Sequence, residues 1–328
     1  MRIMNIYSTP TRRPVAKALE LHYCCTERTK QSAVIMIFES WFCQLIRYNL
    51  EMFKTIISTT DLAANLDNPN WVIVDASYEL ADKAAGYAMY QAGHIPGAVY
   101  AHPFDDLSGP PLTDQGRHPL PSPEKLISVF SRLGISKQTQ VIAYDNRGIT
   151  AARLWWLLNY MGHDLVAVLD GGIEAWKSEG RETSGGDETN ESADFTGTPN
   201  RQMLVVRDEV MEQRLLVDSR NSARFLGDSS GADANAGHIK GAVNRPHSQN
   251  KDENLKLRDP EILRQEFAQL LGEVPSDEAT FYCGSGVSAC QTLLTMAHIG
   301  LKPGKLYVGS WSEWSQFDEL PKESGPAR

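Results

Sequence analysis

The sequence lacks three features that would assign it to particular classes of protein. Positive charge is not in excess: 32 Lys and Arg face 41 Asp and Glu, and the net charge of -9 argues against a nucleic-acid partner. The five cysteines have no paired spacing typical of a zinc site or a secreted disulfide framework, so we expect a cytoplasmic protein. An apolar stretch at 32–46 is interrupted by Glu39 and is shorter than the roughly 20 residues of a membrane span.

Residues 1–51 form an extension of doubtful status. They resemble nothing later in the chain, and basic residues are frequent up to Lys17. Met52 is a plausible alternative start, so we interpret the extension as an upstream-start artefact or a disordered tail. An amphipathic targeting segment is the alternative.

The rest of the chain contains an internal repeat with a displacement of about 140 residues. Four segments match in order: 71–76 with 215–220, 93–98 with 237–242, 141–151 with 279–289, and 169–176 with 307–314. Asp145 stands where Cys283 stands in the second copy. Only the second copy therefore carries a candidate nucleophile.

Short apolar strands alternate with helical segments in both copies. Residues 72–74 and 141–144 have the pattern of buried strands, and 151–161 that of a helix. This alternation predicts an α/β protein of two tandem domains, each with a mostly parallel sheet covered by helices on both faces. We expect the first domain at 52–177, a polar linker at 178–202 and the second domain at 203–320.

Cys283 is the strongest candidate for a functional residue. It follows a short strand at 279–282, and Gly284 and Gly286 allow the next residues to curl so that successive backbone N–H groups point at the sulfur. A helix from about Ser288 adds its positive end. This arrangement favours a thiolate nucleophile at neutral pH, whereas the alternative is a buried structural cysteine.

These motifs resemble those of the tandem-domain rhodanese superfamily of sulfurtransferases. The resemblance rests on the His-Ile-Pro-Gly-Ala segment after an aspartate, on the cysteine loop and on the closing Gly-Ser-Trp-Ser-Glu-Trp, and it covers roughly 55–318. The neutral loop at 283–288 is similar to that of 3-mercaptopyruvate sulfurtransferases, because thiosulfate sulfurtransferases carry basic side chains there. The resemblance implies transfer of a sulfur atom through a Cys283 persulfide to cyanide or a thiol such as thioredoxin, without a metal or organic cofactor.

The resemblance also implies a set of site residues. The backbone at Gly284, Gly286, Val287 and Ser288 would bind the donor and stabilise the charged sulfur. Ser285 would protonate the leaving group, aided by a histidine and an aspartate of the first domain that map to His94 and Asp75. A structural hydrogen bond for His94 and a turn cap for Asp75 are the alternatives.

Arg224 matches the arginine that binds the donor anion in the family, with a surface ion pair as the alternative. The family usually places a second arginine about nine residues later, where this chain has Asp233. Lys240, Arg245 and Arg147 are conjectural substitutes. The preferred donor therefore remains open.

Two other functions and the role of a second cysteine have to be considered. A cysteine-dependent phosphatase needs an arginine six positions after the cysteine, and Ala289 stands there. A non-catalytic binding module is the second rival; the joint retention of Cys283, Ser285, His94 and Arg224 argues against it for the whole chain. Cys290 is either a core residue or a resolving thiol.

Overall fold

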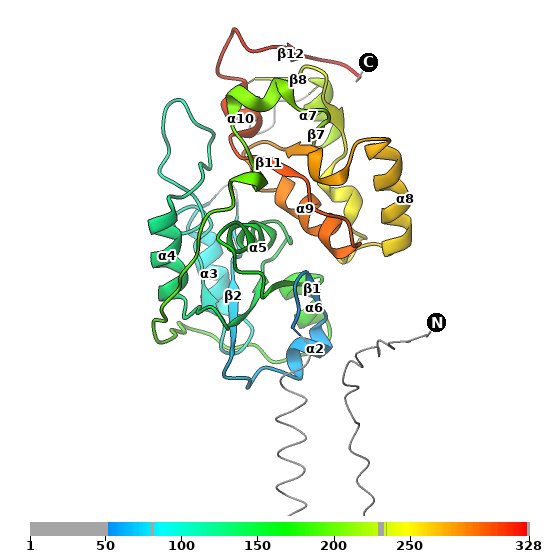
Figure 1. Ribbon diagram of the computed structural model, residues 1–328. Helices are drawn as coiled ribbons and strands as arrows, with labels where there is room; N and C mark the ends of the chain where they lie inside the picture. The colour runs from blue at the N-terminus through cyan, green and yellow to red at the C-terminus, as the bar shows by residue number, and fades with distance from the viewer. Residues whose placement is uncertain (1–51, 80–81, 229–232, 234, 327–328) are drawn as a thin grey trace, which may run out of the picture. The chain divides into compact units, whose positions relative to one another are not determined.

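The computed structural model describes residues 52–79, 82–228, 233 and 235–326, and its elements form two similar halves (Figure 1). The first half contains β1 (Ile56–Ile57), α2 (Thr59–Ala63), β2 (Trp71–Asp75), α3 (Ala85–Ala92), β3 (Val99–Tyr100), α4 (Pro123–Arg132), β4 (Gln140–Tyr144), α5 (Thr150–Tyr160), β5 (Val166–Leu169) and α6 (Gly172–Ser178). Helix α5 and strand β4 agree closely with the elements expected from the sequence.

The second half repeats this plan with short 3-10 turns (η) between the elements. It contains η1 (Arg201–Met203), β6 (Leu204–Val205), η2 (Arg207–Glu212), β7 (Leu216–Asp218), α7 (Ser222–Leu226), β8 (His238–Ile239), β9 (Val243–Asn244), η3 (His247–Asn250), α8 (Pro260–Leu271), η4 (Ser276–Glu278), β10 (Thr280–Tyr282), α9 (Ala289–His298), β11 (Lys305–Tyr307), α10 (Ser310–Trp314) and β12 (Lys322–Glu323).

The two main sheets have the same topology. Their strand orders are β1-β5-β4-β2-β3 and β6-β11-β10-β7-β9, and every neighbouring pair in them is parallel. Strands β4 and β10 therefore occupy the same central place in the two halves. Because Asp145 follows β4 and Cys283 follows β10, the structure confirms the equivalence predicted from the repeat.

Side chains alternate between the two faces of each sheet, as a period of two requires. In β4, Val141 and Ala143 join a core shared with α4 and α5, whereas Ile142 and Tyr144 face α6. Helices thus cover both faces, and the predicted fold class is confirmed. The domain limits at 52–177 and 203–320 stay a prediction.

Local sequence explains where two of the longer helices begin. Ser122 accepts a hydrogen bond from the Lys125 N–H ahead of α4, and Asp259 accepts from the Glu261 N–H ahead of α8. A proline occupies the first turn of both helices, where its missing N–H costs no hydrogen bond.

The two halves share one apolar core. Buried residues of α5 and α9 belong to the same hydrophobic cluster, and Figure 1 shows these helices side by side. Both helices follow the central strands of their sheets, so this packing brings the loop after β4 and the loop after β10 near each other. None of the described helices has the length and apolar character needed to span a bilayer.

Candidate active site

Cys283 lies at the end of the central strand of the second sheet, on the wall of a cavity of about 170 Å³. Its N–H donates to Ser310 Oγ over 3.1 Å, and its carbonyl accepts from the Trp311 N–H over 3.0 Å. The residue is 1% exposed. Hydrogen bonds at both backbone groups therefore fix the position of the sulfur.

The loop after Cys283 depends on glycine at 286. Gly286 has a φ of +74°, and a Cβ there would lie 2.3 Å from the Val308 carbonyl oxygen. Gly284, Val287 and Ser288 line the cavity. Gly286 is not part of the lining, so its role in this structure is to shape the loop.

The equivalent loop of the first half binds a carboxylate with its backbone N–H groups. The Asp145 carboxylate accepts hydrogen bonds from the N–H groups of Gly148, Ile149 (2.8 Å) and Ala151 (2.7 Å). Gly148 also has a positive φ, +63°. A loop of this shape is thus an anion cradle, and Gly286 gives the loop after Cys283 a positive φ at the position equivalent to Gly148.

The first half contributes side chains to the cysteine cavity through the connection between β3 and α4. His118 Nδ1 lies 2.8 Å from Ser285 Oγ, and its ring is 4.9 Å from the Phe104 ring. Burial and the positive charges of Arg153 and Arg117 lower the pKa of His118 to about 4. His118 is therefore neutral at pH 7 and able to exchange a hydrogen bond with Ser285 in either direction.

The structure does not bring His94 or Asp75 to Ser285, which corrects the catalytic assignment made from the sequence. His94 is fully buried, and its Nδ1 hydrogen-bonds the Tyr90 carbonyl over 2.9 Å. His238 makes the same kind of contact with the Phe225 carbonyl in the second half. Because the contact recurs in both copies, it belongs to the repeated fold.

Asp75 also has a structural environment. Its carboxylate accepts a hydrogen bond from the Ser77 N–H over 2.7 Å, as a turn cap would. Burial raises its pKa to about 6. Neither Asp75 nor His94 lines the cysteine cavity, so His118 is the histidine that the sequence analysis missed.

Arg224 lines the cavity, and its guanidinium is paired with Asp233. Its Nε lies 2.8 Å from Asp233 Oδ2, while Arg220 Nη1 lies 3.0 Å from the same oxygen and Arg117 Nη1 lies 3.1 Å from Oδ1. The Asp233 side chain is fully buried. Asp233 therefore places an internal carboxylate on the cation expected to bind the donor.

The conjectured substitutes for a second donor arginine are not in the cavity. Arg147 pairs with Glu79 and Arg245 with Glu266, and neither they nor Lys240 line it. Arg117 lines the cavity instead: it lies beside Arg224 at the site where a Cβ on Gly284 would point. Arg117 comes from the first half, so no spacing within the second half could have revealed it.

A family model for the rhodanese-like domain matches the chain twice, at residues 58–179 and 205–317. The chain belongs to the rhodanese family. The two matches coincide with the two halves built on the parallel sheets, and the Cys283 loop lies in the second.

Curated relatives of this rhodanese carry sulfurtransferase names. It is 37% identical over 278 residues to a probable 3-mercaptopyruvate sulfurtransferase of Pseudomonas aeruginosa, covering 82% of this chain and 98% of the relative. It is 32% identical over 288 residues to the thiosulfate sulfurtransferase of Rattus norvegicus, covering 83% and 95%. This rhodanese is therefore a sulfurtransferase, an enzyme that uses a sulfur donor and an acceptor.

Solved structures agree with the fold. SseA from Escherichia coli, a 3-mercaptopyruvate sulfotransferase of the rhodanese fold, superposes with a TM-score of 0.69 at 29% identity, covering 80% of this chain and all of SseA. The 3-mercaptopyruvate sulfurtransferase of Leishmania major gives 0.71 at 30% identity, covering 80% and 74%.

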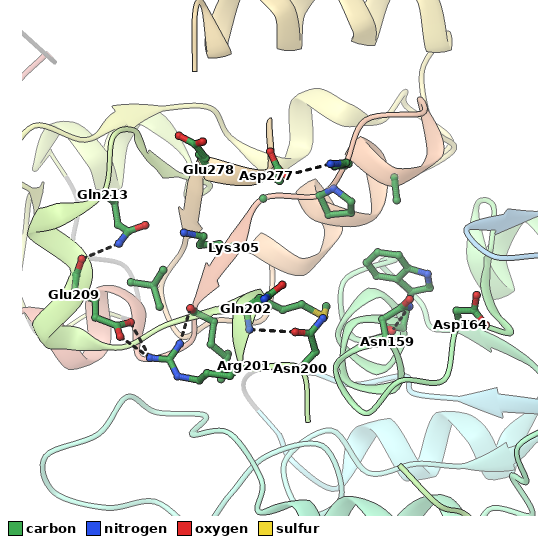
Figure 2. Close-up of a pocket in the computed structure, with 18 of the residues that line it drawn as sticks. Asn159, Asp164, Asn200, Arg201, Gln202, Glu209, Gln213, Asp277, Glu278 and Lys305 are labelled. Carbon is green, nitrogen blue, oxygen red and sulfur yellow. Dashed lines mark hydrogen bonds and ion pairs between the residues drawn. The ribbon is translucent and has the colours of Figure 1, made fainter. Parts of the chain in front are cut away.

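A larger cavity, of about 1020 Å³, lies away from the cysteine (Figure 2). Its polar side chains largely satisfy one another: Arg201 pairs with Glu209 over 2.7 Å, and Asn200 accepts from the Gln202 N–H over 3.1 Å. It contains none of the residues expected at the active site of this rhodanese. The smaller cavity is lined by Cys283 and by three arginines, so it is the candidate site for sulfur transfer.

The remaining candidates have structural roles. Cys290 is fully buried, its Sγ–H donates to the Gly286 carbonyl over 3.4 Å, and burial raises its pKa to about 12. Such a thiol is a poor resolving nucleophile. Arg220 forms an internal ion pair with Asp218. The tryptophans Trp176, Trp311 and Trp314 lie in the hydrophobic clusters.

Proposed function

We propose that Cys283 carries the sulfur as a persulfide and that the donor is 3-mercaptopyruvate or thiosulfate. The Cys283 thiolate attacks the transferable sulfur, the bond from that sulfur to the rest of the donor breaks, and its electron pair leaves with pyruvate enolate or sulfite. An acceptor thiolate or cyanide then attacks the outer sulfur and releases the Cys283 thiolate. No external oxidant or reductant enters this cycle.

One observation carries this proposal: Cys283 ends a strand at the mouth of a loop whose counterpart already holds the Asp145 carboxylate with backbone N–H groups. Thiolate and persulfide are anions of the same charge as that carboxylate. Amide dipoles fixed before the reaction stabilise both without reorganisation, an effect of about 3 kcal/mol for one such donor in other enzymes.

The cavity fits a small anionic donor. Its volume of about 170 Å³ accommodates molecules of the size of thiosulfate or mercaptopyruvate, and Arg117 and Arg224 both line it. We propose that these two guanidinium groups bind the carboxylate or sulfonate end of the donor, and that the Gly284, Val287 and Ser288 backbone holds the sulfur end.

Ser285 and His118 serve the leaving group. With the ring proton on Nδ1, His118 donates to Ser285 Oγ and leaves the serine hydroxyl hydrogen free to be donated into the cavity. An enolate requires a proton to leave as pyruvate, whereas sulfite is a stable anion. The Ser285–His118 pair is therefore needed for mercaptopyruvate and dispensable for thiosulfate.

His118→Gln should distinguish the two donors. We expect kcat for mercaptopyruvate to fall by about 10²-fold, the usual contribution of a positioned proton donor, and kcat for thiosulfate to change by less than about threefold. The measurement is the initial rate of sulfur transfer to cyanide with each donor. His94→Gln, which lies outside the cavity, is the matched control and should give the same kcat ratio between donors as the wild type.

An equal loss of kcat with both donors in His118→Gln would show that His118 does not help to protonate the leaving group. Loss of both activities in His94→Gln alone, with a normal unfolding temperature, would restore His94 to the site.

Acceptor and location follow from the same chemistry. We propose that the physiological acceptor is a small or protein thiol, with thioredoxin as one candidate and cyanide as the assay acceptor. The free thiol at Cys283 has to remain reduced, which suits a cytoplasmic protein. Among the described residues, no group of three or more His, Cys, Asp or Glu is arranged to hold a metal ion.

A further inference from the structure

Arg153 is a buried cation for which the described part of the chain offers no carboxylate partner. It belongs to α5 of the first half and is 1% exposed. Its Nη1 donates to the Gly286 carbonyl over 3.0 Å, while Nε and Nη2 have no oxygen or nitrogen acceptor among the described protein atoms. The guanidinium also lies 5.6 Å from the Trp156 ring centroid.

Arg220 shows how this protein compensates an equally buried arginine. That residue is also 1% exposed, but it is paired with Asp218 and Asp233 and donates to the Gly237 carbonyl. An uncompensated buried charge costs several kcal/mol. The guanidinium of Arg153 therefore requires an anion that the ordinary ion pairs of the structure do not supply.

The groups facing Arg153 leave one candidate for that anion. The titratable and charged side chains that share its cavity are Tyr78, Arg117, His118, Arg224, His247 and Cys283. Burial holds the pKa of His118 and His247 at about 4 and raises that of Tyr78 to about 12, so these three are neutral at pH 7.

The groups behind the loops do not supply the anion either. The Cys290 thiol interacts with the Arg153 guanidinium, but it stays protonated because burial raises its pKa to about 12. The Asp145 carboxylate is held by the N–H groups of its own loop, and the described ion pairs link it to no arginine. Lys251 and Lys83 act on His247 and His118 as positive charges, so neither supplies an anion.

We propose that Arg153 is the counter-cation of the Cys283 thiolate and of its persulfide. The inference rests on the proposed function, in which Cys283 is the nucleophile. Arg153 is a positioning residue: it holds the Gly286 carbonyl, which fixes the cysteine loop, and its charge acts across a region from which water is largely excluded. The half without a nucleophile thus supplies the charge that activates the nucleophile of the other half.

The test is the pH dependence of alkylation of Cys283 by iodoacetamide, followed at the Cys283 peptide by mass spectrometry. In Arg153→Met we expect the pH of half-maximal rate to rise by about one unit or more, because one unit corresponds to 1.36 kcal/mol of lost thiolate stabilisation. Arg153→Lys, which keeps the charge, should shift it by less than half as much. Arg147→Met removes an exposed arginine paired with Glu79 and should shift nothing.

An unchanged midpoint in folded Arg153→Met, or equal shifts in the Met and Lys variants, would overturn the proposal. A second measurement covers the case in which Arg153→Met does not fold. The free energy of unfolding of the wild type relative to Cys283→Ala should rise with pH below the ordinary thiol pKa of about 8.5, since a thiolate stabilised in the folded state releases its proton on folding. A pH-independent difference would contradict the proposal.

Alkylation needs no sulfur donor, so the two proposals fail separately. If alkylation of Cys283 depends on Arg153 but neither donor is turned over, the Arg153 proposal stands and the proposed donors are wrong. If a donor is turned over but alkylation does not depend on Arg153, the proposed function stands and the Arg153 proposal is wrong.

Discussion

Cys283→Ser is expected to lower sulfur transfer from either donor by about 10⁴-fold or more, to the level of the reaction without enzyme. A serine hydroxyl at this position cannot hold a transferable sulfur atom as a persulfide, and the loop that stabilises an anion does not ionise an alcohol. The fold should survive, because the substitution removes no backbone hydrogen bond of the Cys283 residue. The measurement is the rate of thiocyanate formation from cyanide with each donor.

The matched control is Cys290→Ala, which removes the neighbouring buried thiol seven residues later. It should retain most of the activity, because Cys290 does not line the cavity and its thiol is a buried, neutral hydrogen-bond donor to the Gly286 carbonyl. A Cys283→Ser enzyme that keeps more than a few per cent of the wild-type rate would contradict the assignment of the nucleophile.

Asp233→Asn should destabilise the protein by about 3 kcal/mol and make it sensitive to anions. The Asp233 carboxylate is fully buried and pairs with Arg117, Arg220 and Arg224. Removing one partner of a buried pair leaves its cations uncompensated, which costs about 3 to 5 kcal/mol. Sulfate should restore part of the stability, because it replaces the missing charge on Arg224 and Arg117.

The same substitution should lower KM for thiosulfate by about tenfold, which corresponds to roughly 1.4 kcal/mol of better anion binding, with a smaller change in kcat. Asp164→Asn is the control: it removes an exposed carboxylate paired with Lys54 and should change stability by less than about 1 kcal/mol without a response to sulfate. Urea unfolding with and without sulfate measures both effects. A stable, sulfate-insensitive Asp233→Asn protein would show that this carboxylate does not hold the arginines.

The sequence predicted most of the fold because its signals are local. Apolar runs of strand length, glycines at loop positions and the repeat placed β4, β10, α5 and α9 within a residue or two of their positions in the structure. The equivalence of Asp145 and Cys283 also follows from the repeat alone. It proved informative because the structure shows the first loop holding a carboxylate.

The residues that complete the site were less accessible. His118, Arg117 and Arg153 all come from the first half and reach Cys283 only through the packing of one half against the other, which no spacing in the sequence encodes. The adjacent Arg117 and His118 in the proline- and glycine-rich connection at 102–123 were the available signal. His94 was misleading because a conspicuous motif surrounds it; its counterpart His238 in the other copy indicated a structural role.

If Cys283 carries the transferred sulfur, the mass of the protein after incubation with a donor and no acceptor will reveal the bound sulfur. We expect the wild type to gain one sulfur atom on the peptide that contains Cys283, and to lose it when cyanide or a thiol is added. Cys283→Ser should gain none. A gain on another cysteine, or turnover of a donor with no sulfur bound to Cys283 at any time, would contradict the account.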